Sequence, residues 1–271
     1  MMTEQTQVNE PLAQVEFDYD RAPGHWILAR MGKRVLRPGG RELTVKLVNA
    51  LNISPEDDVV EFAPGLGFTA GLVLQRRPRS YIGIELDDAA AAEARRILNA
   101  ASQRIIVGDV LHSGLDDACA SVVYGEAMLT MQADSRKLKI VLEAVRLLRS
   151  GGRYGIHELC LKPDDIALEH KQSVQRDLAH ALRVNARPLT VSEWQSLLVE
   201  AGLHVEATLF NPMRLLEPTR MVADEGLARA VRIALNILRT PAARRRILNM
   251  RAVFNRYADH LGAVAIVAVK R

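Results

Sequence analysis

The sequence predicts an α/β fold, built on a mostly parallel sheet with helices on both faces. Short apolar runs alternate with longer segments of helical periodicity along the 271 residues. Most of these runs are rich in β-branched residues, as is typical of strands covered on both faces. The expected strands are 58–62, 81–84, 104–107, 120–124, 153–157, 205–210 and 263–269. We therefore expect seven strands.

Helices are expected between these strands. Apolar residues at helical spacing predict a helix over 135–149, which Gly151 ends. Thr190 and Glu193 have the spacing of a capping box, in which both side chains accept hydrogen bonds from free amides at a helix start. Further helices are expected over 41–51, 89–101, 164–184, the start of the segment after Gly67, and much of 211–262.

Three helical additions are predicted to cover one end of the sheet. We divide the chain into a tail and cover segment, 1–40, and one domain, 41–271, with helical insertions at about 163–187 and 211–262. Residues 1 to about 14 read as a loose polar tail. The second insertion carries Met213, Leu215, Leu216, Met221, Leu227 and Ile233. These residues predict a helical lid over an apolar pocket, with a homodimer contact as the alternative.

Composition excludes several classes of protein. No apolar run approaches the roughly 18 residues of a transmembrane helix, and the amino terminus lacks a signal-peptide core. Cys119 and Cys160 cannot form a disulfide framework, so we expect a cytoplasmic protein. The spacing of His157, His170 and His180 fits no local set of metal ligands, so no metal site is expected.

The net charge of +4 is concentrated in a late cluster of arginines. The cluster comprises Arg239, Arg244, Arg245, Arg246, Arg251 and Arg256. We interpret it as a solvated helix face. An anionic partner, whether phosphate, acidic lipid or RNA, is the alternative.

A Gly-rich turn after the first strand is the main candidate site. Gly65 and Gly67 let a ligand approach the backbone and meet the amides of a helix start. The spacing Gly65-x-Gly67-x-x-Ala70 also satisfies the dinucleotide fingerprint, so the turn alone leaves two cofactors open. Glu61 decides against the dinucleotide, since a carboxylate there opposes a pyrophosphate and suits an ammonium or sulfonium group.

Two further strand ends suit a nucleoside. Glu85 ends the second strand and can accept hydrogen bonds from both hydroxyls of a ribose, which both cofactors carry. Asp109 and Val110 follow the third strand. There the carboxylate can accept from the amino group of an adenine, while the Val110 amide donates to its ring.

Together these segments resemble the class I S-adenosylmethionine-dependent methyltransferases. Glu61-x-Ala63-x-Gly65-x-Gly67 matches their first motif with Ala63 in place of a glycine, which argues against a positive φ there. The further matches are Glu85-Leu86, Gly108-Asp109-Val110, Gly125-Glu126 after the fourth strand, and 147–153 before the fifth. The resemblance covers about residues 40–210. It implies a Rossmann-like sheet whose last strand is antiparallel and inserted between the fifth and sixth.

The same resemblance implies the cofactor S-adenosyl-L-methionine. The residues expected to bind it are Glu61, Ala63, Gly65, Gly67, Glu85, Leu86, Asp109, Val110 and Gly125. Lys33 or Arg34 is a candidate for neutralising the carboxylate of the donor.

The absence of known acceptor motifs narrows the range of possible methyl acceptors. Tyr124-Gly125-Glu126-Ala127-Met128 stands where methyltransferases of adenine, cytosine or glutamine amino groups carry (N/D/S)-P-P-(Y/F/W). What remains resembles the small-molecule enzymes, which include quinone and sterol C-methyltransferases. We expect methyl transfer to a small, partly apolar acceptor, with no nucleic-acid partner. The alternatives are an RNA methyltransferase using the basic C-terminal helix, a nicotinamide oxidoreductase and a non-catalytic cofactor-binding subunit.

Methyl transfer mainly requires that donor and acceptor be aligned, and a base is needed only where the acceptor carries a proton. The predicted catalytic residues are His157, Glu126 and Glu158, at the carboxyl ends of the fourth and fifth strands. His157 is the best single base, because an unperturbed histidine titrates near ~6.5. Tyr19, His25, Trp26 and Arg34 are candidates for the pocket mouth.

Overall fold

The computed structural model describes residues 17–271, and the predicted tail over residues 1–14 lies outside them. The described residues contain an eight-stranded sheet. Its strands are β1 (Asp58–Phe62), β2 (Ser80–Glu85), β3 (Gln103–Val107), β4 (Ala120–Glu126), β5 (Leu148–Leu161), β6 (Leu189–Thr190), β7 (Leu203–Pro212) and β8 (Leu261–Lys270). The seven predicted strands are all present, and the two-residue β6 was not predicted.

The strand order is β3-β2-β1-β4-β5-β8-β7, with β6 paired to β5. Strands β1 to β6 pair in parallel, whereas β8 runs antiparallel to both β5 and β7. The predicted insertion of an antiparallel last strand is therefore confirmed. The register aligns Glu61 with Tyr124, and Glu126 with His157, at the carboxyl ends of the central strands.

Ten α-helices surround the sheet in the described part of the chain. They are α1 (Gly24–Arg30), α2 (Gly40–Ala50), α3 (Phe68–Leu74), α4 (Asp88–Arg95), α5 (Asp134–Leu147), α6 (Leu168–Leu182), α7 (Val191–Glu200), α8 (Pro218–Glu225), α9 (Leu227–Arg239) and α10 (Pro241–Arg256). Two 3₁₀ turns add η1 (Val110–His112) and η2 (Leu129–Met131).

Local sequence signals explain several helix ends. The predicted capping box of Thr190 and Glu193 starts α7, and Asp87 starts α4 by accepting a hydrogen bond from Ala90 N. The predicted carboxyl-terminal ends of two helices, α4 and α5, were wrong, and α1 was not predicted. Helix α4 ends before 101, and α5 ends before 149 because Leu148 already pairs with Ala120 in the sheet.

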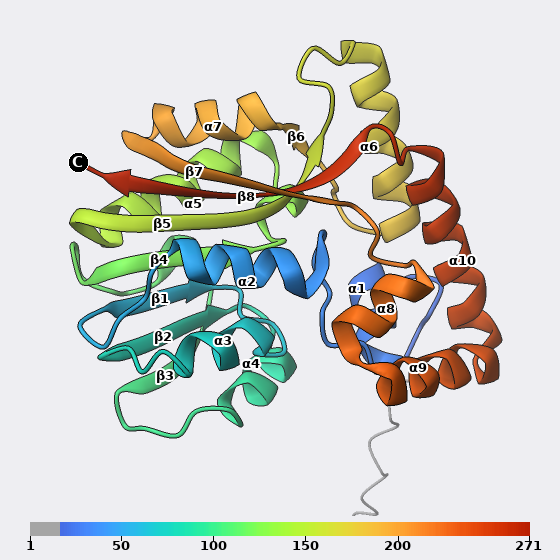
Figure 1. Ribbon diagram of the computed structural model, residues 1–271, viewed down its shortest axis with the longest axis horizontal. Helices are drawn as coiled ribbons and strands as arrows, with labels where there is room; N and C mark the ends of the chain where they lie inside the picture. Colours follow the sequence, from blue (N-terminus) through green and yellow to red (C-terminus); the bar gives the residue numbers. More distant parts are fainter. Residues whose placement is uncertain (1–16) are drawn as a thin grey trace, which may run out of the picture.

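The helices form two layers and a lid. Helices α5 and α7 pack on one face of the sheet through Ile140, Val141 and Trp194, and α2, α3 and α4 pack on the other. A separate core joins α1, α6, α9 and α10 through residues such as Ile27 and Met250. This lid gathers beyond the carboxyl ends of the parallel strands (Figure 1). Within residues 17–271, no helix has the length and apolar character to traverse a bilayer.

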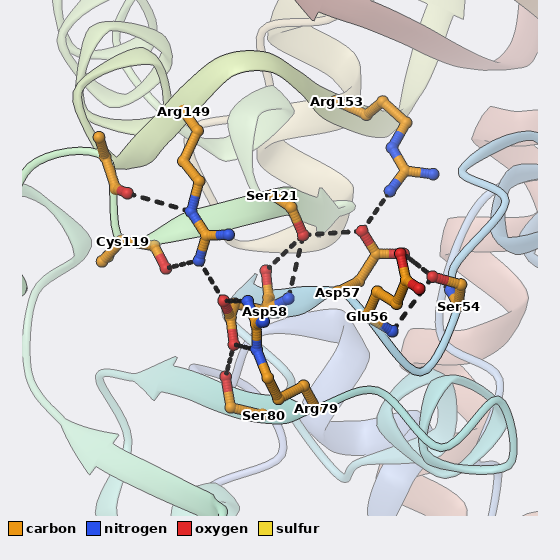
Figure 2. A network of polar contacts seen from close by, with 11 residues as sticks. Ser54, Glu56, Asp57, Asp58, Arg79, Ser80, Cys119, Ser121, Arg149 and Arg153 are labelled. Carbon is orange, nitrogen blue, oxygen red and sulfur yellow. Dashed lines mark hydrogen bonds and ion pairs between the residues drawn. The ribbon is translucent and has the colours of Figure 1, made fainter.

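A polar network ties the opposite ends of the strands together (Figure 2). Asp58 accepts hydrogen bonds from Arg79, Ser80 and Arg149, and Arg79 in particular holds the pKa of Asp58 well below its ordinary value. Asp57 accepts from Ser121 at 2.7 Å and from Arg153. Strands β1, β2, β4 and β5 are thus fastened at their amino ends, which leaves their carboxyl ends to shape the site.

Candidate active site

A cavity of about 230 Å³ lies between the carboxyl ends of the central strands and the lid. One end is formed by the Gly-rich turn and by Glu85 at the end of β2. The other end is formed by apolar side chains of β5 and the lid, namely Leu159, Leu182, Val184, Met213, Met250 and Phe254. A polar end and an apolar end therefore share one space.

The Gly-rich turn opens toward this cavity. Gly65 has φ +57°, and a Cβ built on it would meet nothing within 4 Å. Gly67 instead allows close packing, since a Cβ built on it would lie 2.8 Å from Ile97. Gly67 is not part of the cavity wall. Ala63 adopts φ +54°, so the expectation of an ordinary φ was wrong. Pro64 disfavours the right-handed helical region for the residue before it, and Ala63 N donates to Ile84 O at 2.9 Å.

Glu85 connects the turn to β2. Its carboxylate accepts hydrogen bonds from Gly65 N at 2.8 Å and from Asp87 N at 3.1 Å, and it lines the cavity. A carboxylate can accept about four hydrogen bonds, so two positions remain for hydroxyl groups of a ligand. The neighbouring Leu86 is exposed to solvent and does not line the cavity.

Glu61 lies behind the cavity wall. Tyr81 and Tyr124 donate their hydroxyls to the same carboxylate oxygen at 2.5 and 2.6 Å. Burial raises the pKa of Glu61 to about 7, in spite of these two hydrogen bonds. The carboxyl group is thus poised between its neutral and ionised forms near neutral pH.

The remaining predicted cofactor residues also lie outside the cavity wall. Asp109 caps η1 by accepting from Leu111 N and pairs with Arg136 at 2.5 Å, while Val110 is buried. Gly125 is closely packed, because a Cβ built on it would lie 3.1 Å from the sulfur of Met128. Their contact with a cofactor stays a prediction.

Glu126 is the centre of a buried ionic cluster at the cavity wall. It accepts hydrogen bonds from Thr44 at 2.8 Å and from Thr69, and it pairs with His157 Nδ1 at 2.6 Å and Arg37 Nε at 3.3 Å. Burial opposes the charge, but Arg37 and His157 outweigh it and hold the pKa of Glu126 at about 2. Glu126 is therefore a carboxylate.

His157 has no free nitrogen in this cluster. Its Nδ1 faces the Glu126 carboxylate, and its Nε2 lies 2.5 Å from the carbonyl oxygen of Pro38. Both partners can only accept, so both ring nitrogens donate and the imidazole is a cation. The side chain is fully buried and does not line the cavity. This arrangement favours a positioning role over the predicted role as a base.

Glu158 is also held away from the cavity. Its carboxylate accepts from the backbone amides of Met128, Leu129 and Thr130, and from the Thr130 hydroxyl. These bonds satisfy the start of η2 and fix the segment after β4. Of the three predicted catalytic residues, only Glu126 lines the cavity.

The amino-terminal cover contributes one important residue that was not predicted. Arg37 lines the cavity, donates to Thr69 Oγ1 at 2.7 Å and lies over the Phe68 ring. Its only sequence signal is a position just before the Pro38-Gly39-Gly40 turn.

The other cover residues divide into two groups. His25, Trp26 and Arg34 line the cavity as expected, whereas Tyr19 packs on Phe17. Lys33 is fully buried beside Asp224 and Glu225, so it does not neutralise a donor in the cavity.

Residues 60–156 match the family model of a methyltransferase domain. This segment contains the Gly-rich turn, Glu85 and Glu126, and the sheet around it has the order described above. The chain belongs to the class I S-adenosylmethionine-dependent methyltransferases. A close match in sequence extends further: the chain is 30% identical over 251 residues to an uncharacterized protein of Haemophilus influenzae, covering 91% of this chain and 98% of the relative.

Solved structures of methyltransferases share the fold. The chain is similar to a phosphoethanolamine N-methyltransferase of Haemonchus contortus solved with S-adenosylhomocysteine, with a TM-score of 0.69 and 14% identity over 91% of this chain and 57% of that one. It is also similar to a geranyl diphosphate methyltransferase solved with sinefungin, with a TM-score of 0.60 and 17% identity over 85% and 77%.

The cofactor of this methyltransferase is S-adenosyl-L-methionine. The cavity fits such a molecule, because open space lies over Gly65 and Glu85 presents free acceptor positions beside it. A nicotinamide oxidoreductase, one of the alternatives, is excluded by the family.

Proposed function

We propose that this methyltransferase acts on a small, partly apolar molecule bound beneath the helical lid. The observation that carries the proposal is the single cavity that runs from the Gly-rich turn to the apolar lid walls. A donor at the turn and an acceptor under the lid would then face each other in one enclosed space.

The donor end has residues suited to each part of the cofactor. Glu85 has acceptor positions left for the ribose hydroxyls, and Gly65 leaves room for close approach. Glu61 lies behind the same turn, where its carboxylate form would favour a nearby ammonium group. Arg37 is a cation that lines the cavity, and its Nε, although ion-paired with Glu126, has no hydrogen-bond acceptor. It suits a carboxylate better than Lys33, which is engaged elsewhere.

The acceptor end suits an aliphatic or cyclic hydrocarbon part. Leu159 from β5, Leu182 and Val184 from the α6 region, and Met213 and Phe254 from the lid line it. Methionine side chains adapt to irregular ligands, and burying apolar surface here contributes roughly 25 cal/mol per Å². The similar geranyl diphosphate methyltransferase was solved with GPP, which also combines a charged and an apolar part.

Methyl transfer requires little of the protein beyond the alignment of donor and acceptor. The sulfonium of the cofactor activates its methyl group for in-line displacement by the acceptor. Holding two reactants in line can supply about 7–11 kcal/mol of the barrier. Glu126 and His157 fix the walls by their ion pair, and the lid excludes water. No base is required where the acceptor atom carries no proton at attack.

The test is methyl transfer from radiolabelled cofactor into fractions of a cell extract. We expect label in the organic-soluble, low-mass fraction, and its loss in Met213→Trp, which fills the acceptor end. Met221→Trp is the matched control, because Met221 belongs to the same lid and does not line the cavity.

A measurement of cofactor binding distinguishes a blocked acceptor end from a damaged cofactor site. Met213→Trp should keep the wild-type affinity for S-adenosylhomocysteine, since the turn and Glu85 are unchanged. Label in RNA would overturn the proposal in favour of an RNA methyltransferase. The absence of label from every fraction, with normal cofactor binding, would favour the non-catalytic alternative.

A further inference from the structure

Helix α9 carries an apolar face that points away from the protein. Leu227, Val231, Leu235 and Leu238 are all exposed, with Leu227 at 69% and Leu238 at 59%. Their spacing places them on one side of the helix. Ala230 and Ile233, on another side of the helix, are buried against the protein. An outer face of a surface helix is ordinarily polar, so this face is suited to contact something other than water.

The surrounding segment carries charge of one sign only. Residues 226–258 contain eight arginines and no aspartate, glutamate or lysine. The arginines are Arg229, Arg232, Arg239, Arg244, Arg245, Arg246, Arg251 and Arg256. A segment with this composition attracts anions.

Several of these arginines have internal partners. Arg245 pairs with Asp20, Arg256 with Asp177, and Arg246 donates to backbone carbonyls. Within residues 17–271, the exposed Arg232 and Arg239 form no ion pair. Arg244, in the first turn of α10, is also exposed and forms no ion pair in the described part of the chain. The positive charge that is free to act outward therefore lies on α9 and at the adjoining start of α10.

Arg232 and Arg239 border the apolar face. They lie seven positions apart, which places them on the same side of the helix, next to Leu235. Arginine stems can lie along apolar surface while the guanidinium reaches the lipid headgroups. A helix with aliphatic residues on one side and arginines along its border has the pattern of helices that lie in the interface of a bilayer.

We propose that α9 docks this methyltransferase onto a membrane that contains anionic lipids. A second copy of the chain fits the face less well, because a two-fold contact would bring two acid-free, arginine-rich surfaces together. RNA fits less well too, since the exposed residues are aliphatic and offer no ring on which a base can stack.

The docking face adjoins the cavity through α1. Ile233 packs within 4 Å of the Cβ position of Gly32, and Asn236 donates to Met31 O at 3.0 Å. Gly24, His25, Trp26 and Leu28 of α1 contribute to the cavity wall. Figure 1 shows α9 at the outer edge of the lid, beside α1 and away from the sheet. Docking by α9 would hold the cavity next to the bilayer, although the inference itself does not depend on which acceptor is methylated.

Vesicle co-sedimentation tests the proposal. The full chain is mixed with vesicles of phosphatidylcholine alone or of phosphatidylcholine with phosphatidylglycerol. We expect binding to the anionic vesicles only, weakened by salt. Val231→Glu with Leu238→Glu should reduce it more than about tenfold. Arg232→Gln with Arg239→Gln should reduce it by about 25-fold, from about fivefold for each arginine.

Leu168→Glu with Val199→Glu is the matched control. Both residues are exposed apolar side chains outside α9, Leu168 on α6 and Val199 on α7, and the pair makes the same change in charge. The control should bind like the wild type, and all variants should keep S-adenosylhomocysteine binding, which shows that they are folded. The proposal is overturned if the wild type does not bind the anionic vesicles, or if the Val231→Glu/Leu238→Glu variant binds them as well as the control does. It is also overturned if the wild type binds no vesicles but self-associates, and this variant abolishes the self-association.

Discussion

His157 Nδ1 lies 2.6 Å from Glu126 Oε1, between residues that pair directly across β4 and β5. The contact joins two strand ends with a charged pair that is fully removed from water. Arg37 adds a second cation on the other carboxylate oxygen. The cluster thus has more positive than negative charge, and Arg37 also lines the cavity.

Removing the charge of Glu126 is expected to destabilise the protein. Glu126→Gln leaves Arg37 and His157 buried without their counter-ion, and breaking a buried pair in this way costs about 3–5 kcal/mol. Thr44→Val is the control, because it removes one hydrogen bond to the same carboxylate and leaves the charges in place, so it should cost less, about 1.5–3 kcal/mol. Urea denaturation at neutral pH measures both. Equal stability of Glu126→Gln and wild type would contradict the described cluster.

Asp224 is expected to hold helix α8 against the amino-terminal cover. It lies 3.5 Å from Lys33 Nζ and accepts a hydrogen bond from Arg41 N at 2.9 Å. Asp224→Asn and Lys33→Met should each destabilise the protein by a few kcal/mol, because each leaves a partner charge buried. The double variant should cost less than the sum of the two, which a double-mutant cycle detects. Strict additivity would show that the two groups do not interact.

Some of the residues that line the cavity could be predicted from their position along the chain. Glu85 and Glu126 end β2 and β4, and Gly65 lies in the turn after β1. Parallel strands bring their carboxyl ends to one edge of the sheet, so position along the chain was enough. Arg37 was missed because its partners, Thr69 and Glu126, are distant in sequence.

The backbone conformation of Ala63 and the protonation of His157 could not be predicted from the sequence for a different reason. The left-handed backbone of Ala63 costs an alanine about 1–2 kcal/mol, which the surrounding fold can impose. Nor does a sequence show that His157 has an acceptor on each ring nitrogen, since the Pro38 carbonyl belongs to the backbone of a remote turn.

Glu85 is expected to be essential for binding the cofactor. Glu85→Ala removes acceptors for the ribose and also the bond that holds Gly65 N, so affinity for S-adenosylhomocysteine should fall at least about tenfold. Glu93→Ala is the control, since Glu93 is exposed on the following helix α4. Isothermal titration calorimetry measures both affinities. Unchanged binding in Glu85→Ala would place the cofactor elsewhere.

Glu61 is expected to make stability depend on pH near neutrality. Burial raises its pKa from 4.5 to about 7, so the folded protein binds more protons than the unfolded chain between these values. Its contribution is therefore fully present below about pH 4.5 and is lost as pH rises through about 7, by about 3 kcal/mol in all. Urea denaturation at a series of pH values from about 5 to 8 should show this decline in the wild type.

Glu61→Gln should flatten that decline, because a glutamine can still accept from Tyr81 and Tyr124 but does not ionise. Cofactor binding should move in the opposite sense. If the carboxylate form of Glu61 favours the ammonium group of the cofactor, affinity for S-adenosylhomocysteine rises with pH through about 7 in the wild type and not in Glu61→Gln. A parallel pH dependence of affinity in the two proteins would show that Glu61 supports the turn without sensing the bound charge.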